Sequence, residues 1–374
     1  MIKVAADKYL FELEEMVPKE VDLHLYDPGK GFPGNLGEIK ALLIRTVTPI
    51  NSDTLPKLPD SLSFIGTGSA GIDHIDQEIL NKRGINVSNA AGCNARSVAE
   101  FVCTTLLFWA SQKEISLRKK SIGIVGVGNV GSELNSMLQK LGIVTICYDP
   151  PKEDRDTEFK SSTIDEVLDT DIITFHTPLI KSGNYPTYHW LDEKKLTHYQ
   201  FDLVINTARG GVIDESALLD AKFNGRVGDF IIDVWENEPV FNDEIAQNAY
   251  LFTPHIAGYS IQAKQRATSM IVEAMCQYFS IPYTHPTFNN NRTNIPEINT
   301  STYSLAEVLL NIHPFKKYQE KLATLIGKPP QEKGRGFNRL RAQFPLRNEY
   351  QFLTIDQHII DAYPVLNKLG ISAK

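Results

Sequence analysis

The chain has 374 residues, which is more than one ordinary domain holds, so we expect two or three domains. A hydrophobic content of 42% and a charged content of 22% are typical of a folded globular protein, and a net charge of −7 argues against nucleic-acid binding. The longest apolar run, "FVCTTLLFWA", is too short to cross a bilayer, so we expect no membrane-spanning segment.

The N-terminus and the cysteines indicate the compartment. "MIKVAADKYLFE" lacks the basic-then-apolar pattern of a signal peptide, which predicts a cytoplasmic protein. Cys93, Cys103, Cys147 and Cys276 are far apart and form no C-x-x-C pair. We therefore expect neither a metal site nor a disulfide framework.

Four short apolar runs predict β-strands in the first part of the chain. They are "IKVAA", "ALLIR", "LSFIGTG" and "INVSNA", with helical stretches near residues 11–16 and 75–82. This alternation is typical of a parallel sheet covered by helices. Residues 97–111 then predict a long and largely buried helix.

A second series of six apolar runs follows. They are "SIGIVGVG", "IVTICYD", "DIITFHTP", "DLVINTARG", "GDFIIDVW" and "YLFTPHIAG". Six strands with helices between them make one complete dinucleotide-binding unit. Residues 260–279 have the apolar spacing of an amphipathic helix.

The composition changes after residue 285. "HPTFNNNRTNIPEINTSTYS" is rich in Asn, Thr and Pro and predicts a linker or long loop. Residues 286–374 hold 12 Lys or Arg against 7 Asp or Glu. Residues 328–347 hold one acid and six basic side chains, which are Lys328, Lys333, Arg335, Arg339, Arg341 and Arg347. Such a run is either a solvated face or an anion-binding surface.

A glycine pattern predicts the cofactor site. "IGIVGVGNVG" places Gly126, Gly128 and Gly131 between an apolar strand and a helix-like run. These glycines would allow a tight turn, a close approach to a pyrophosphate and close helix–strand packing. The helix start, with Asn129 and Val130, would offer N–H groups to phosphates. A glycine-rich turn without a ligand is the alternative.

The next strand ends in Asp149, where a carboxylate can accept hydrogen bonds from ribose hydroxyls. It would repel a 2′-phosphate, which favours NAD over NADP. Lys152 and Arg155 lie nearby and weaken that preference.

Charged side chains follow the last three strands. Arg209, Asp233, Glu238 and His255 would converge, because ligands bind at the carboxyl ends of the strands in such a sheet. A lone histidine is by default structural, and each charged residue alone could form a surface ion pair. Their combination after a cofactor loop predicts a catalytic site instead.

These residue types suit the oxidation of an alcohol next to a carboxylate. His255 can take the hydroxyl proton while a hydride leaves for a nicotinamide. Glu238 would orient the imidazole and favour its protonated form. Arg209 can hold the substrate carboxylate with a two-pronged hydrogen bond. Asp233 is better placed for the nicotinamide amide or its ribose.

The motifs "GIVGVGNVG", "ARGGVID", "DVWENEP" and "TPHIAG" resemble the D-2-hydroxyacid dehydrogenase family over about residues 1–285. The resemblance implies an α/β fold with two doubly wound parallel-sheet domains. Residues 1–96 and 260–285 would form a flavodoxin-like substrate domain, and residues 97–259 a Rossmann NAD-binding domain. Residues 286–374 would form a C-terminal α+β dimerisation domain.

Within that family, "IRTVTPIN", "AAGCNARSVAEFV", "CYDPP" and "PHIAGYS" are most similar to the members that oxidise 4-phospho-D-erythronate in pyridoxal phosphate biosynthesis. The similarity implies a homodimer with Arg209, Glu238 and His255 as the catalytic set. It implies NAD contacts from the glycine loop and from Asp149, Thr177, Asp233 and Gly258. It implies substrate contacts from Thr46, Thr67 and Tyr259. Thr46 replaces the serine usual in the family, although a hydroxyl is retained.

A phosphorylated substrate needs Arg or Lys for its phosphate. Arg45 is one candidate. The local charge excess motivates the hypothesis that Arg339, Arg341 or Arg347 reaches an active site, of its own or of a partner subunit.

Two alternatives remain open. One is another member of the same family, acting on phosphoglycerate, glycerate or lactate. The other is a non-catalytic NAD-sensing binding protein, against which the full Arg–Glu–His set argues.

Overall fold

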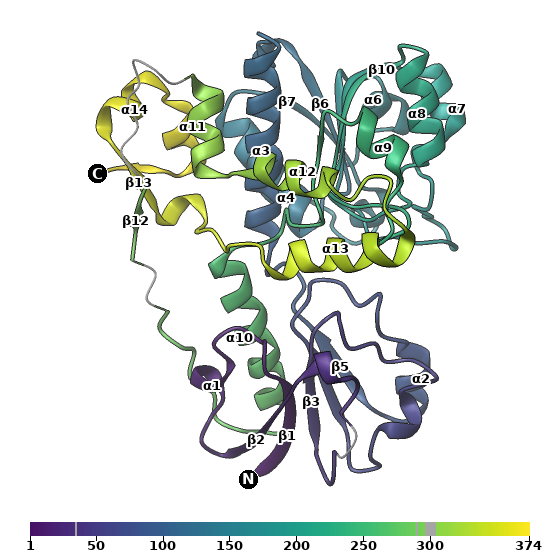
Figure 1. The fold of residues 1–374 in the computed structure, drawn as a ribbon, viewed down its shortest axis with the longest axis vertical. Helices are drawn as coiled ribbons and strands as arrows, with labels where there is room; N and C mark the ends of the chain where they lie inside the picture. Colours follow the sequence, from purple (N-terminus) through teal and green to yellow (C-terminus); the bar gives the residue numbers. More distant parts are fainter. Residues whose placement is uncertain (34–35, 289–290, 296–303) are drawn as a thin grey trace. The chain divides into compact units, whose positions relative to one another are not determined.

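The computed structural model describes residues 1–33, 36–288, 291–295 and 304–374. The chain divides into two compact units (Figure 1). The first unit combines residues 1–94 with 260–290, and the second combines residues 95–259 with 291–374.

The first unit is built on a parallel sheet in the order β2-β1-β3-β4-β5, which is the strand order of flavodoxin-like folds. The strands are β1 (Ile2–Asp7), β2 (Val21–Tyr26), β3 (Ala41–Ile44), β4 (Phe64–Thr67) and β5 (Asn86–Asn89). The helices are α1 (Leu13–Met16), α2 (Gln77–Lys82) and α10 (Ile261–Tyr278). Leu42 faces the core that contains α2, and Leu43 faces the core that contains α10.

The second unit is built on a six-stranded parallel sheet in the order β11-β10-β9-β8-β6-β7. The strands are β6 (Ser121–Val125), β7 (Val144–Tyr148), β8 (Ile172–Phe175), β9 (Phe201–Asn206), β10 (Val227–Ile232) and β11 (Leu251–Phe252). The order reverses between β6 and β8. At such a point a doubly wound sheet opens a crevice beyond the carboxyl ends of its strands.

Helices cover both faces of this second sheet. The helices are α3 (Ala95–Gln112), α4 (Asn129–Lys140), α5 (Pro150–Glu153), α6 (Ile164–Leu168), α7 (Glu193–His198), α8 (Glu215–Phe223) and α9 (Asp243–Asn248). Leu203 packs into the core with α3 and α4, whereas its neighbour Val204 packs into the core with α6, α7 and α8. The strands are therefore apolar on both faces, as a buried parallel sheet requires.

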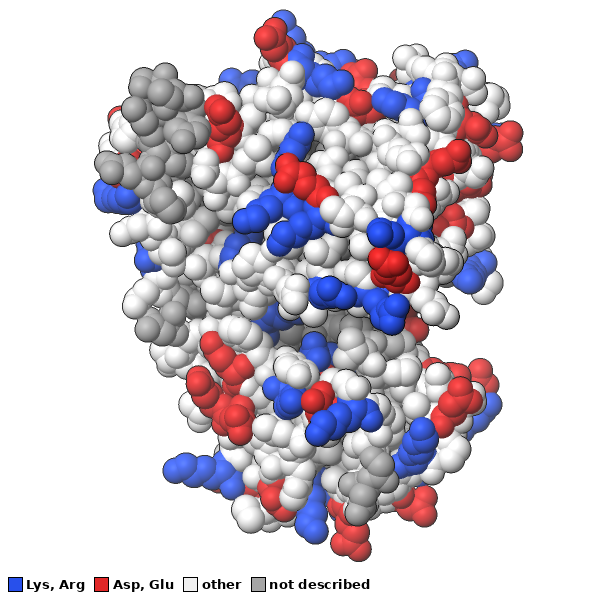
Figure 2. All heavy atoms as spheres, viewed as in Figure 1, with Lys and Arg blue, Asp and Glu red and all other residues white. Residues whose placement is uncertain are grey.

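Residues 291–374 contribute a small parallel sheet and five helices to the described part of the second unit. The elements are β12 (Thr293–Asn294), α11 (Leu305–Ile312), α12 (Phe315–Ala323), α13 (Pro330–Ala342), β13 (Leu353–Ile355), α14 (Gln357–Ala362), α15 (Val365–Leu369) and β14 (Ser372–Ala373). Figure 2 shows Lys and Arg side chains gathered over α12 and α13.

A buried ion-pair network ties this segment to α3. Glu100 is fully buried and accepts hydrogen bonds from Arg96 at 2.8 Å and from Arg347 at 2.6 Å. The backbone N–H of Tyr350 donates to the same carboxylate at 2.9 Å. Many apolar side chains of the segment, including Ile359, share one core with α3 and α4.

Both predicted sheets and the two long helices, α3 and α10, are confirmed. β2 was not predicted, because "VDLHLY" is an edge strand with partly exposed polar residues rather than an apolar run. Half of the predicted linker, residues 285–304, lies outside the described residues, and the described half contains the two-residue strand β12. In the part of the chain that the structure describes, no helix is long and apolar enough to cross a membrane. Nor do any three His, Cys, Asp or Glu side chains of that part gather as metal ligands.

Candidate active site

The glycine loop joins β6 to α4. Gly126 has a φ of +89°, a left-handed conformation that favours glycine. A Cβ on Gly131 would lie 2.0 Å from the carbonyl oxygen of Gly126, so only glycine lets the helix begin this close to the strand. Gly128 and Asn129 are exposed and Val130 is half-buried at the first turn of α4. A Cβ on Gly128 would meet no atom within 4 Å, so a ligand can approach the N–H groups of this turn.

A cavity of about 490 Å³ opens beside this loop. Its lining residues are Val127, Gly128, Asn129, Ser132, Glu133, Asp149, Lys152 and Arg155. Asp149 Oδ2 accepts the Val127 N–H at 2.7 Å, and Asp149 Oδ1 accepts the Lys152 N–H at 2.9 Å. The cavity therefore joins a helix N-terminus to two carboxylates and two cations.

Two hydroxyls test whether a dinucleotide fits. Thr177 backs the glycine loop, since a Cβ on Gly126 would lie 2.7 Å from Thr177 Cγ2. Thr177 Oγ1 and Thr207 Oγ1 are buried and have no hydrogen-bond partner among the described residues. Because buried hydroxyls are normally paired, these two fit a polar ligand lying across the ends of β8 and β9.

The loops after β9 and β10 touch through their backbones. A Cβ on Gly210 would lie 1.7 Å from the carbonyl oxygen of Trp235, so only glycine permits this approach. Arg209 precedes it and is half-buried, with one Nη1 hydrogen bond to the Ala208 carbonyl at 2.8 Å. Arg209 therefore lies next to the loop that carries Glu238.

Glu238 and His255 form a pair. Glu238 Oε2 lies 2.8 Å from His255 Nδ1, and Glu238 Oε1 accepts the Trp235 N–H at 2.9 Å. Burial raises the pKa of Glu238, but His255, the Trp235 N–H and the charge of Arg341 together hold that pKa below its ordinary value. A proton held on Nδ1 by Glu238 leaves Nε2 of His255 to exchange a proton with a substrate.

Asp233 shapes the loop that carries His255. It is 1% exposed, and its carboxylate accepts the Ile256 N–H at 2.8 Å and the Ala257 N–H at 3.0 Å. The Thr253 hydroxyl donates to it at 2.6 Å. These bonds hold His255 at a φ of +55°, which a residue with a side chain rarely adopts. The contact of Asp233 with NAD stays a prediction.

Gly258 and Tyr259 follow in the same loop, Gly258 within a turn. The ring of Tyr259 packs edge-on against Phe344, with ring centroids 5.8 Å apart. Ile256 and Tyr318 complete this small cluster. The C-terminal segment therefore packs directly on the loop that carries His255.

Three other predicted residues belong to the first unit. Thr46 is exposed in a turn after β3. Thr67 is fully buried, and its hydroxyl lies 3.0 Å from His74 Nε2. Arg45 binds the buried Asp7 with its Nε at 2.8 Å. Contacts of these three residues with a substrate stay predictions.

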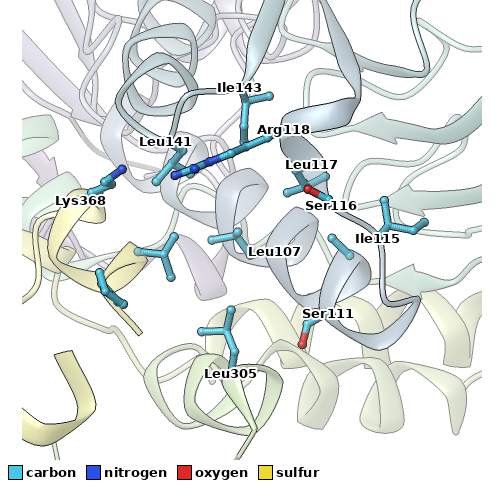
Figure 3. A pocket seen from close by; sticks show the side chains of 13 residues that line it. Leu107, Ser111, Ile115, Ser116, Leu117, Arg118, Leu141, Ile143, Leu305 and Lys368 are labelled. Atoms are coloured by element: carbon cyan, nitrogen blue, oxygen red, sulfur yellow. The ribbon is translucent and has the colours of Figure 1, made fainter. Parts of the chain in front are cut away.

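A second cavity, of about 470 Å³, lies elsewhere in the second unit (Figure 3). Six of its thirteen lining residues are Leu or Ile, such as Leu107, Leu117 and Ile143, and Arg118 and Lys368 are its charged residues. It holds no carboxylate–imidazole pair, so the predicted chemistry is not located there.

Comparisons with known proteins settle the family. Residues 107–257 match the family described as "D-isomer specific 2-hydroxyacid dehydrogenase, NAD binding domain". An erythronate-4-phosphate dehydrogenase of Bacteroides thetaiotaomicron is 39% identical over 287 residues, 76% of this chain and 82% of the relative. One of Escherichia coli (O1:K1 / APEC) is 35% identical over 356 residues, 92% of each chain. The chain belongs to the erythronate-4-phosphate dehydrogenase family.

Solved structures agree on the fold of this erythronate-4-phosphate dehydrogenase family member. The D-lactate dehydrogenase from Aquifex aeolicus complexed with NAD and lactic acid has a TM-score of 0.60 at 25% identity, over 74% of this chain and 95% of that chain. An NAD-dependent formate dehydrogenase from Staphylococcus aureus has a TM-score of 0.60 at 21% identity, over 76% of this chain and 97% of that chain. The predicted fold class is confirmed, and the match to an NAD-binding domain confirms the predicted cofactor.

Sequence reasoning missed a second carboxyl near the site. Glu215 Oε1 accepts the Glu236 N–H at 2.8 Å, and His189 Nε2 lies 2.8 Å from Glu236 Oε1. Burial raises the pKa of Glu215 to about 7, and the charges of Glu236, Glu238 and Asp214 add to the rise although the hydrogen bond from Glu236 opposes it. The sequence offered one signal, since Glu215 lies in "ARGGVIDES" close to Arg209, but no sequence pattern predicts its hydrogen bond with the Glu236 N–H.

Proposed function

We propose that the chain oxidises 4-phospho-D-erythronate with NAD⁺ to (R)-3-hydroxy-2-oxo-4-phosphooxybutanoate, a step of pyridoxal 5′-phosphate biosynthesis. Curated relatives with the matching name, at 35–39% identity, support the substrate. The 2.8 Å contact between Glu238 Oε2 and His255 Nδ1, at the carboxyl ends of β10 and β11, is the observation that carries the chemistry.

The proposed catalytic roles follow from the site. Arg209 binds the substrate carboxylate through two parallel hydrogen bonds. His255 Nε2 accepts the proton of the C2 hydroxyl as the C2–H bond breaks, and a C=O bond forms at C2. Bound NAD⁺ supplies the acceptor for the hydride. Glu238 stabilises the imidazolium that results, which then returns its proton to water.

The proposed cofactor residues surround the glycine loop. Gly126, Gly128 and Gly131 would let the start of α4 bind the pyrophosphate. Asp149 would accept the ribose hydroxyls, which favours NAD over NADP. Thr177 supports this placement, since its buried hydroxyl has no hydrogen-bond partner in the described part of the chain.

A substrate panel tests the function. The purified chain is assayed for NADH formation from NAD⁺ with 4-phospho-D-erythronate, 3-phospho-D-glycerate, D-glycerate and D-lactate. We expect the highest kcat/KM for 4-phospho-D-erythronate. A preference for another acid would make the chain a different family member. Binding of NADH without turnover of any acid would favour the NAD-sensing alternative.

The assembly and compartment are part of this proposal. The resemblance of residues 286–374 to a dimerisation domain supports a homodimer. NAD and phosphorylated intermediates are cytoplasmic metabolites, which supports a cytoplasmic enzyme. Light scattering should give twice the mass of the chain, and a monomeric mass would contradict the homodimer.

A further inference from the structure

Helix α13 is fixed to the loop that carries Glu238. Lys333 Nζ binds Asp243 Oδ1 at 2.6 Å and the Phe241 carbonyl at 3.2 Å, and the lysine side chain is only 8% exposed. A Cβ on Gly334 would lie 3.3 Å from Pro239, the residue after Glu238. The helix and the loop therefore share a partly buried ion pair and close packing.

The chain after α13 is fixed to the loop that carries His255. Phe344 packs against Tyr259 and against Tyr318, with ring centroids 5.8 Å and 4.6 Å apart. Ile256, the residue after His255, lies in the same cluster. Arg341 stands in the last turn of α13, between these two anchored regions.

Arg341 differs from the other basic residues that could bind a phosphate. In the described part of the chain its side chain has neither an ion pair nor a hydrogen bond, and its Nε is buried without a partner. Its charge nevertheless acts on the Glu238 carboxylate and helps to lower the pKa of Glu238. Arg347 instead binds Glu100, and Arg339 is exposed.

The charge balance at this point favours an anionic ligand. A half-buried guanidinium whose donors are not hydrogen-bonded to an acid costs free energy that a ligand oxyanion would offset. Arginine also matches phosphate geometry with two parallel N–H donors. Figure 2 shows that Lys and Arg side chains are gathered over α12 and over α13, the helix that carries Arg341.

We propose that Arg341 binds the phosphate of the substrate in the active site of its own chain, and so sets the preference for phosphorylated 2-hydroxy acids. This rests on the proposed function. The phosphate of 4-phospho-D-erythronate is only a few bonds from the carbon that loses the hydride. A cation held beside the Glu238–His255 pair is therefore within reach of it.

Kinetics of matched variants test the proposal. Arg341→Ala should raise KM for 4-phospho-D-erythronate by about 10- to 100-fold, the value of a lost charge-assisted hydrogen bond. Its kcat/KM for D-erythronate, which lacks the phosphate, should stay within about two-fold. Arg341→Lys should restore part of the preference for the phosphorylated substrate, since lysine keeps the positive charge but lacks the two parallel N–H donors of arginine. Arg339→Ala is the matched control and should leave KM and kcat/KM unchanged for both substrates.

A binding measurement covers the case in which D-erythronate turns over too slowly. The rise in Tm that 4-phospho-D-erythronate gives should shrink in Arg341→Ala and persist in Arg339→Ala. If Arg341→Ala lowered kcat/KM equally for 4-phospho-D-erythronate and D-erythronate, Arg341 would only support the loop, and the proposal would be overturned. An unchanged preference for the phosphorylated substrate would overturn it as well. Failure of the wild-type chain to oxidise 4-phospho-D-erythronate would instead overturn the proposed function, and it is seen before any variant is made.

Discussion

His255 and Glu238 are each held by groups that come from other parts of the chain. The Trp235 N–H fixes one oxygen of Glu238, and Asp233 fixes the two amides after His255. The pair is thus oriented before a ligand binds. Such preorganisation is what makes a general base effective, because no reorganisation is needed during the reaction.

The histidine gives a direct prediction. His255→Ala should lower kcat by about 10²- to 10⁴-fold, the usual contribution of a general acid–base residue. NADH affinity, measured by fluorescence titration, should stay within about three-fold, because the glycine loop is untouched. His198→Ala, at an exposed position of α7, is the control. Near-normal turnover by the His255 variant would remove it from the catalytic set.

Glu215 predicts a pH dependence of stability. Its pKa is raised by burial to about 7 in the folded chain, against about 4.5 for an ordinary glutamate. Between those values the unfolded chain loses this proton first, so Glu215 lowers the stability of the wild type as pH rises through the window. Glu215→Gln keeps an oxygen for the Glu236 N–H and removes the charge.

We therefore expect the stability of Glu215→Gln relative to wild type to grow between pH 4.5 and about 7, reaching about 1–3 kcal/mol. Urea unfolding at a series of pH values measures it. A difference that does not vary with pH would mean that Glu215 titrates normally.

At the scale of elements, the site depends on two loops that meet at Gly210. Gly210→Ala would place a methyl group 1.7 Å from the Trp235 carbonyl, so one loop must move. We expect a loss of about 1–3 kcal/mol in the free energy of unfolding, as for other overpacked sites. We also expect kcat to fall at least about ten-fold, because the shift displaces Arg209 or Glu238 from its position in the site. Gly128→Ala, which meets no atom within 4 Å, should leave stability within about 0.5 kcal/mol. Wild-type kcat in Gly210→Ala would show that the loops tolerate separation.

Strand ends could be predicted from the sequence, but contacts between distant segments could not. Arg209, Glu238 and His255 each follow an apolar run, and parallel strands bring such positions to one edge. The Lys333–Asp243 pair joins residues 90 positions apart, and neither residue has a local pattern that names its partner. The basic run around α13 was visible, yet only the structure separates its buried ion pairs from Arg341.

At the scale of the whole molecule, residues 291–374 belong to the same compact unit as the NAD-binding sheet. Their hold on α3 is partly electrostatic, through Arg347 and Glu100, and partly apolar, through one shared core. The segment that carries Arg341 therefore depends for its position on the packing of the entire unit, and the stability of that unit and the recognition of substrate are expected to be linked.

Arg347→Ala tests that linkage. It leaves Glu100, which is fully buried, with Arg96 as its remaining cation among the described residues, at 2.8 Å. Breaking a buried ion pair by removing one partner typically costs about 3–5 kcal/mol, because the other charge stays desolvated. We expect a loss of that size in urea unfolding, whereas Arg335→Ala, at an exposed position of α13, should lose less than about 0.5 kcal/mol. The Arg347 variant should also lose more affinity for 4-phospho-D-erythronate than for NADH, because the segment that holds α13 loses part of its support. If stability fell while substrate affinity did not, the C-terminal segment would be a scaffold for the unit without a part in recognition.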